Sequence, residues 1–146
     1  MIMPKLLLFI CLLPSISFAQ SIKDKVYGSV VVDEVTSVYD GDTFRVNINA
    51  WPGIVGQRIP VRVLGIDTPE MRGKCKFEKN LAREAKKATV QSLRAAKKIE
   101  LRGIKRGKYF RVLANVYVDG KSLANILINK KLAVKYSGGT KINWCK

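Results

Sequence analysis

The spacing of apolar residues along the chain changes from a strand period to a helix period and back again. Three early stretches have the alternating or β-branched apolar residues that are typical of strands: 26–35, 43–48 and 59–66. The stretch 49–58 contains a proline and two glycines, so we expect it to be a hairpin connection. From Phe77 to about Lys97, apolar and small residues recur at helical spacing with basic residues on the other faces. This pattern predicts one long amphipathic helix, with Phe77 on its buried face.

The remainder of the chain returns to the strand pattern. Two further strands are expected at 99–104 and 109–118, followed by a turn at 119–120 and a short helix within 123–128. Five strands with a long helix inserted after the third indicate an α+β, β-rich fold. The expected architecture is a five-stranded Greek-key barrel of the OB type with a short second helix. Barrels of this size commonly bind oligonucleotides on one face.

The first residues have the features of an export signal. Lys5 is followed by an unbroken apolar run at 6–13, and small residues precede a candidate cleavage point after Ala19. The run is too short to span a bilayer, so we expect no stable membrane insertion. We therefore predict a signal peptide at 1–19, a single domain at 20–146, and a protein that is secreted or periplasmic.

Composition limits the binding partners and the catalytic mechanisms that this chain can have. The 146 residues contain 27 Lys and Arg against 11 Asp and Glu, for a formal charge of +16, and no histidine. A hydrophobic content of 47% supplies a core, so this charge suggests a polyanionic partner, either nucleic acid or an acidic membrane surface. The membrane alternative is weaker because the long helix offers mainly alanines. Without an imidazole, Ser-His-Asp, Cys-His and HExxH chemistry are excluded, which leaves carboxylate, Arg, Lys, Tyr and metal chemistry.

Three of the few acids are expected to meet at one end of the sheet. Asp67 and Glu70 follow a predicted strand at its exit, and Asp42 lies at the entry of the neighbouring strand. Carboxylates here, with a backbone carbonyl such as that of Thr68, would suit Ca²⁺ or Mg²⁺. Taken separately, the Asp-Gly step at 40–41 is an ordinary turn and Asp67 an ordinary cap.

Taken together, the motifs along the chain resemble those of a known protein family. From about residue 38 to 135 the sequence resembles the staphylococcal nuclease family, which are secreted Ca²⁺-dependent nucleases built on an OB barrel. The matching motifs, in order, are Asp-Gly-Asp-Thr at 40–43, Arg-x₄-Asp-Thr-Pro-Glu at 62–70, Ala-Lys-Lys-Ile-Glu at 96–100, Lys-Tyr-x-Arg at 108–111, Tyr-x-Asp-Gly-Lys at 117–121 and Leu-Ala at 132–133. Each motif alone is weak, but their joint order and spacing are specific.

The resemblance implies roles for the acid cluster. Asp42 and Asp67 match the carboxylates that hold Ca²⁺, and Thr68 matches the residue that gives its carbonyl. Glu70 matches the carboxylate that takes a proton from the attacking water or orients it.

The resemblance also implies roles for basic residues. Arg62 and Arg111 match two guanidinium groups that grip the scissile phosphate, and Lys108 and Tyr109 match residues that contact a neighbouring phosphate. Phe110 departs from the pattern, because the family has a small residue between the tyrosine and the arginine. The family's base-packing tyrosine has no clean counterpart, since the nearest, Tyr136, sits one position early.

The activity implied by the resemblance is Ca²⁺-dependent hydrolysis of DNA and RNA without sequence preference, leaving 3′-phosphates. The substrate would be single-stranded or frayed duplex, and the protein a monomer. The alternative is a non-catalytic OB-fold nucleic-acid-binding module, because some relatives keep the barrel without the acids. The acids and both arginines are all present in this chain, which favours an enzyme.

Cysteine usage suggests a covalent tie. Removal of the leader would leave Cys75 and Cys145 as the only cysteines, and an even pair in an oxidising compartment predicts one disulfide. Such a bond would link the segment after Glu70 to the C-terminus. The alternative is two free thiols.

Overall fold

The computed structural model describes residues 25–145. The predicted signal peptide at 1–19 lies outside the described residues and stays a prediction. Across 25–145, no helix combines the length and apolar character needed to cross a bilayer.

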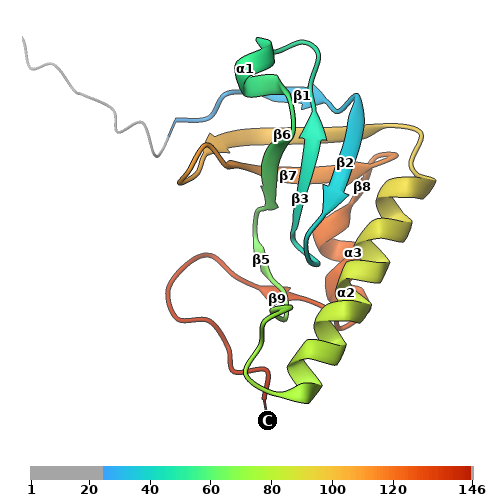
Figure 1. Ribbon diagram of the computed structural model, residues 1–146, viewed down its shortest axis with the longest axis vertical. Helices are drawn as coiled ribbons and strands as arrows, with labels where there is room; N and C mark the ends of the chain where they lie inside the picture. Colours follow the sequence, from blue (N-terminus) through green and yellow to red (C-terminus); the bar gives the residue numbers. More distant parts are fainter. Residues whose placement is uncertain (1–24, 146) are drawn as a thin grey trace, which may run out of the picture.

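The core of the fold is a seven-stranded sheet that curls into a barrel (Figure 1). In spatial order its strands are β1 (Ser29–Val31), β6 (Ile99–Arg106), β7 (Val112–Val118), β4 (Ile59–Val63), β3 (Thr43–Asn47) and β2 (Glu34–Val38), with β8 (Lys121–Ser122) also paired to β7. All pairings are antiparallel except that of β4 with β7.

The barrel closes because the first extended segment changes partner halfway. The Val32 N–H donates to the Ile99 carbonyl on β6, and the next N–H, of Asp33, donates to the Asn47 carbonyl on β3. β1 and β2 therefore form a single path that joins the two ends of the sheet. Counted in this way the barrel has five strands, and the predicted OB architecture is confirmed.

Three predicted strands differ in detail. The stretch 26–35 is not one strand but contributes to β1 and β2. The predicted strand at 59–66 is interrupted at Gly65, whose φ is 81°, and resumes as β5 (Ile66–Asp67), which pairs with β9 (Val134–Lys135). The strand expected from residue 109 begins only at Val112, because Tyr109 and Phe110 adopt left-handed backbone angles.

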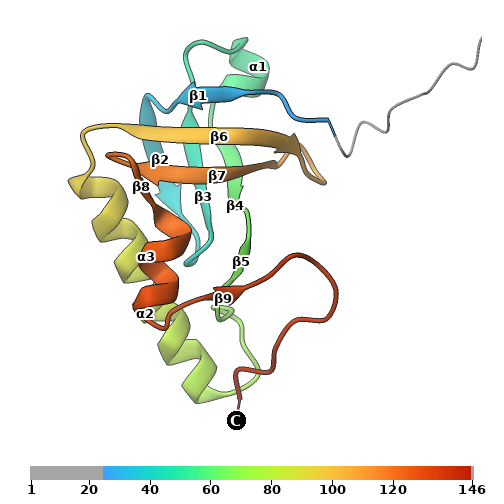
Figure 2. The ribbon, with the colours of Figure 1, turned by 180° about the vertical axis from the view of Figure 1, so that it is seen from behind.

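The two predicted helices are present, together with a third, short one. α2 (Lys76–Ala95) is capped at its N-terminus by Cys75, and α3 (Leu123–Asn129) by Ser122, whose hydroxyl accepts the Asn125 N–H. Both lie side by side under one end of the barrel (Figure 2). The connection at 49–58 also forms a single turn of helix, α1 (Gly53–Gly56), that the pattern did not predict.

α2 meets the barrel through small side chains. Its buried residues include Ala82, Ala85 and Ala88, whose small side chains let the helix approach the sheet closely, and Leu93 near its end. The prediction that Phe77 faces the core is wrong, because this side chain is 59% exposed in the first turn of α2. Strand alternation is regular in β4, where Val61 and Val63 point into the core and leave the intervening residue to face outward.

Candidate active site

The turn between β2 and β3 presents the first acids of the site. The Asp42 N–H donates to Asp40 Oδ1 at 3.1 Å, which is the geometry of an Asx turn. Gly41 lies against α2, and a Cβ at this position would come within 2.9 Å of the Ala85 Cβ. The Thr89 hydroxyl on α2 donates to the Gly41 carbonyl at 2.6 Å. The helix therefore fixes the backbone that carries Asp42.

One arginine joins two buried acids across the end of the barrel. Arg62, the outward residue of β4, places Nη1 3.1 Å from Asp42 Oδ1 and Nη2 3.4 Å from Asp67 Oδ1. Asp67 ends β5, and both carboxylates belong to residues only 1% exposed. Charges so deeply buried are retained only when they are paired or hold a cation. The structure thus brings together the two acids and the arginine that the sequence singled out.

Burial and the repulsion between neighbouring carboxylates raise the pKa values of the acids in the β2–β3 turn. Burial raises the pKa of Asp42, and the Arg62 charge opposes this shift. Burial raises the pKa of Asp40 to about 7, and the negative charge of Asp42 adds to the effect. Sequence reasoning missed Asp40 as part of the site, because its place before a glycine already explained it as a turn residue. Its two-residue spacing from Asp42 was the available signal.

Glu70 lies on a loop held by a second, buried glutamate. Glu78, in the first turn of α2, accepts the Lys74 N–H at 2.9 Å and the Glu70 N–H at 3.3 Å. Gly73 lies so close to the Glu78 carboxylate that a Cβ there would overlap it. Glu78 was not singled out from the sequence, and its one visible signal was an acid in the first turn of a helix.

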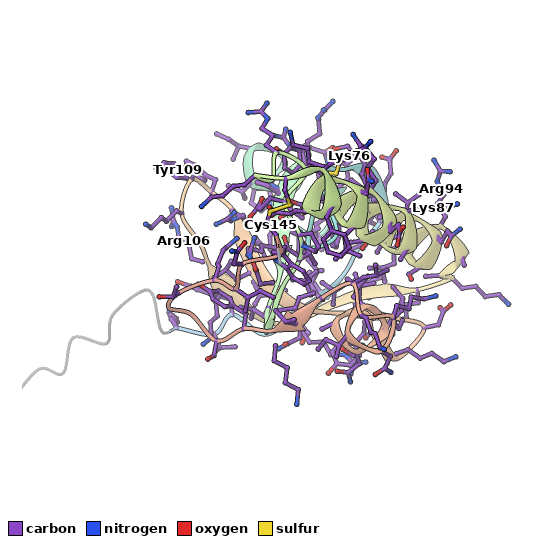
Figure 3. The ribbon with its side chains drawn as sticks, turned by 90° about the horizontal axis from the view of Figure 1, so that it is seen from below. Lys76, Lys87, Arg94, Arg106, Tyr109 and Cys145 are labelled. Carbon is purple, nitrogen blue, oxygen red and sulfur yellow. A yellow bond between two sulfur atoms is a disulfide. The ribbon has the colours of Figure 1, made fainter. Side chains whose placement is uncertain are left out.

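The predicted disulfide is present and closes this loop. Cys75 and Cys145 are bonded with their Cα atoms 5.9 Å apart, and 70 positions separate them in the sequence. The bond fixes the end of the chain beside the N-terminus of α2 (Figure 3). Within 25–145, the one tight grouping of cysteine and acidic ligand atoms is Cys75, Glu78 and Cys145. Because its two sulfurs are bonded to each other, it offers no thiolate to a metal.

The C-terminal segment carries a lysine into the acid cluster. Lys141 Nζ lies 2.6 Å from Glu70 Oε1 and 2.9 Å from Asp67 Oδ1. Burial alone would lower the pKa of Lys141, but the bonds to Glu70 and Asp67 outweigh burial and raise it. Lys141 lies outside every motif, so nothing in the sequence distinguished it from the other cations.

Three of the predicted residues line an open pocket of about 600 Å³. Arg62, Glu70 and Arg111 line it together, and Tyr136 lies at its edge with its hydroxyl donated to the Gly139 carbonyl. The Nε of Arg111 is buried, and no residue of the described part of the chain accepts a hydrogen bond from it.

Lys108 and Tyr109 do not reach the acids. They line an adjoining groove that also contains Arg111, and Tyr109 is 92% exposed. Figure 3 shows Tyr109 near Arg106 at the edge of the molecule, on the loop between β6 and β7. Arg111 therefore belongs to both the pocket and the groove, and connects them.

The donor set of the site fits a hard divalent cation. Asp42 and Asp67 offer carboxylate oxygens, buried Thr68 adjoins Asp67, and neither histidine nor a free thiol is available among these residues. Two buried carboxylates that meet at one arginine would gain from a cation between them.

Comparison with known proteins adds independent evidence. A family described as staphylococcal nuclease homologues matches residues 60–143. The chain is 36% identical over 96 residues to "Endonuclease YncB" of Bacillus subtilis (strain 168), and 38% identical over 96 residues to "SPbeta prophage-derived endonuclease YokF" of the same organism. Each alignment covers 64% of this chain, but only 43% and 30% of those two proteins, respectively. The chain thus spans less than half the length of the relatives it matches.

Proposed function

The chain belongs to the family of staphylococcal nuclease homologues, and on that premise we propose that it is a metal-dependent nuclease that hydrolyses phosphodiester bonds. The observation that carries the proposal is the bridge made by Arg62 between two buried carboxylates, Asp42 and Asp67, at the wall of an open pocket. A buried acid pair can hold a divalent cation, and a cation with guanidinium groups beside it suits a substrate centre that is itself an anion. The names of both relatives, which are endonucleases, agree with this proposal.

The basic side chains would bind the phosphate. Arg62 uses one nitrogen on each acid, so its remaining N–H groups are free to donate to a phosphate oxygen in the pocket. Arg111 lines the same pocket from the residue just before β7, the strand that pairs with β4. Two planar guanidinium groups match the charge that is shared over the equatorial oxygens during displacement at phosphorus.

The acids would bind the metal and the water. Asp42 and Asp67, with the Thr68 carbonyl, would hold Ca²⁺, which supplies Lewis-acid polarisation of the phosphoryl oxygen when bound. Glu70 lines the pocket with an exposed carboxylate and would take a proton from the attacking water or orient it. The Glu78 hydrogen bonds and the disulfide hold the Glu70 loop in place for this task.

The proposed substrates are DNA and RNA, single-stranded or frayed, cut without sequence preference to leave 3′-phosphates. The formal charge of +16 supports binding through backbone phosphates, which carry no sequence information. Binding should therefore weaken steeply as salt rises. We propose that the protein acts as a monomer.

We also propose that the protein is exported. The apolar run at 6–13 with its small-residue cleavage point supports this, and so does the Cys75–Cys145 disulfide, which is stable in oxidising compartments. Calcium outside the cytosol is abundant enough to fill a site of moderate affinity.

The test is cleavage of labelled single-stranded DNA and of RNA, in Ca²⁺ and in chelator, by the purified protein. We expect cleavage that needs Ca²⁺ and that falls at least about 100-fold in Glu70→Gln, because a positioned base contributes about 10²- to 10⁴-fold. Glu84→Gln is the matched control, since Glu84 is an exposed glutamate on α2 and should leave the rate unchanged. Salt-sensitive binding without cleavage under any metal would instead assign the chain to the non-catalytic binding modules.

A further inference from the structure

The loop between β6 and β7 exposes two aromatic rings, carried by residues that both have left-handed backbone angles. Tyr109 and Phe110 are consecutive non-glycine residues with φ of 56° and 59°, a conformation that L-residues seldom adopt. Both are exposed, Tyr109 at 92% and Phe110 at 70%. Positive φ at both central residues is what a tight two-residue hairpin turn requires, and the Arg111 N–H closes this turn by donating to the Lys108 carbonyl at 3.1 Å. The turn leaves both rings outside the core, so their surface is available to a ligand.

The two rings lie on different sides of Arg111. Tyr109 lines the groove already described, which runs along β2, β3 and β4. Phe110 instead lines a second groove of about 450 Å³, which we call the Phe110 groove. Its floor is apolar and formed by three buried residues from three strands, Ile59, Ile104 and Val112.

The rim of the Phe110 groove is aromatic and basic. Tyr27 and Trp51 stand with Phe110 around the floor, and Tyr27 is about half exposed. The Arg106 guanidinium lies 5.6 Å from the centroid of the Phe110 ring, and Lys25 Nζ lies 5.4 Å from that of Tyr27. Flat apolar surfaces beside cations match the two parts of a nucleotide, a base and a phosphate.

The Phe110 groove shares one lining residue, Arg111, with the proposed catalytic pocket. Arg111 lines the pocket, the Tyr109 groove and the Phe110 groove. A strand whose scissile phosphate lies on Arg111 therefore has aromatic surfaces within reach on two sides.

We propose that the Phe110 groove is a base-stacking subsite for a nucleotide of single-stranded nucleic acid, next to the nucleotides bound at the scissile bond. The inference rests on the proposed nuclease function and deepens it by naming a surface that would bind an unpaired base of the substrate. A base in a duplex has both faces stacked and cannot enter such a groove, whereas an unpaired base can. The subsite thus favours single strands, without reading sequence, because every base has a flat face.

Binding of a labelled hexanucleotide, measured in chelator so that no cleavage occurs, tests the proposal. Phe110→Gly removes the ring while suiting the positive φ, so the loop is expected to keep its path. We expect hexanucleotide binding to weaken about 5- to 100-fold, the effect of losing one base–aromatic contact. A dinucleotide, measured as a competitor of the hexanucleotide, should bind both proteins equally because it fills only the scissile site.

Two further variants separate stacking from general loss of hydrophobic surface. Phe110→Tyr retains a flat ring and should bind the hexanucleotide as the unsubstituted protein does. Phe77→Ala removes an exposed ring from α2, outside the groove, and should change nothing. A Phe110→Gly protein that binds the hexanucleotide with unchanged affinity, while Arg111→Ala weakens it, overturns the subsite and leaves the nuclease proposal standing. If the unsubstituted protein binds neither oligonucleotide, the subsite falls, and the nuclease proposal falls with it only if cleavage in Ca²⁺ is absent as well.

Discussion

Glu78 provides a sharp test of how the fold controls the Glu70 loop. This carboxylate is nearly buried, and it accepts N–H groups from Lys74 and from Glu70 itself. Glu78→Ala removes both acceptors at once. The disulfide is unaffected by this change, so the loop remains tied at Cys75 but loses its internal support.

The expected magnitude follows from the two bonds. A hydrogen bond to a charged group contributes about 1.5–3 kcal/mol, and the 3.3 Å bond to the Glu70 N–H lies at the weak end. Removing a buried charge gives back part of this, so we expect a net loss of about 2–3 kcal/mol in the free energy of unfolding. Misplacement of a reacting group by about 1 Å costs on the order of 100-fold in rate, so kcat should fall by about 10- to 100-fold.

Urea denaturation and steady-state cleavage of single-stranded DNA measure the two effects separately. Glu78→Gln keeps one acceptor oxygen but sets its amide N–H against a backbone donor, so its losses should be intermediate. Glu84→Ala, an exposed change on the same helix, should leave both quantities unchanged. A Glu78→Ala protein with lowered stability but an unaltered kcat would refute the argument that Glu78 positions Glu70.

Three further predictions concern the disulfide, the lysine and the buried acid. Cys145→Ser should lower the free energy of unfolding by about 4 kcal/mol, the loop-closure value for a separation of 70 residues, and reductant should have the same effect on the unsubstituted protein. A urea midpoint for Cys145→Ser equal to that of the oxidised unsubstituted protein would contradict this. Lys141→Met should strengthen Ca²⁺ binding about 5- to 10-fold in calorimetry, because the ammonium competes for Asp67 and Glu70; an unchanged affinity counts against competition. Burial raises the pKa of Asp40 in the folded protein to about 7 from its ordinary value of 3.8, so ionised Asp40 destabilises the fold progressively as pH rises from about 4 to 7. Asp40→Asn should therefore have the same free energy of unfolding as the unsubstituted protein near pH 4, and a value higher by up to about 4 kcal/mol above pH 7 in chelator. Equal free energies of unfolding at both pH values would show that the fold does not raise the pKa of Asp40.

Much of the fold could be predicted because it rests on local periodicity. Alternation of Val61 and Val63 with an outward residue, and alanines at helical spacing in α2, are direct consequences of which face is buried. The choice of strand partner is different, since apolar alternation does not say which neighbour accepts each N–H. The change of partner at Val32–Asp33 was therefore missed. Tyr109 and Phe110 have high strand propensity, but tertiary context holds them in a turn.

The site residues that could be predicted from the sequence are those whose residue type is scarce in this chain. Acids are scarce in a chain of +16, so Asp42, Asp67 and Glu70 stood out, and the structure places them close to one pocket. Cations are abundant, so Lys141 could not be distinguished from the rest; the β5–β9 pairing before it and the disulfide after it bring it into the site.

The most direct test of the central claim is the single-turnover rate of cleavage of a short single-stranded oligonucleotide in saturating Ca²⁺ by Arg62→Lys. Lysine keeps the positive charge between Asp42 and Asp67 but loses the planar donors proposed to face the phosphate. We predict a rate at least about 100-fold lower than that of the unsubstituted protein, the usual effect of losing such a donor. Arg94→Lys, an exposed change near the end of α2, should leave the rate unaltered (Figure 3). An Arg62→Lys protein that cleaves at the full rate would contradict the claim that this bridge of arginine and acids is the catalytic centre.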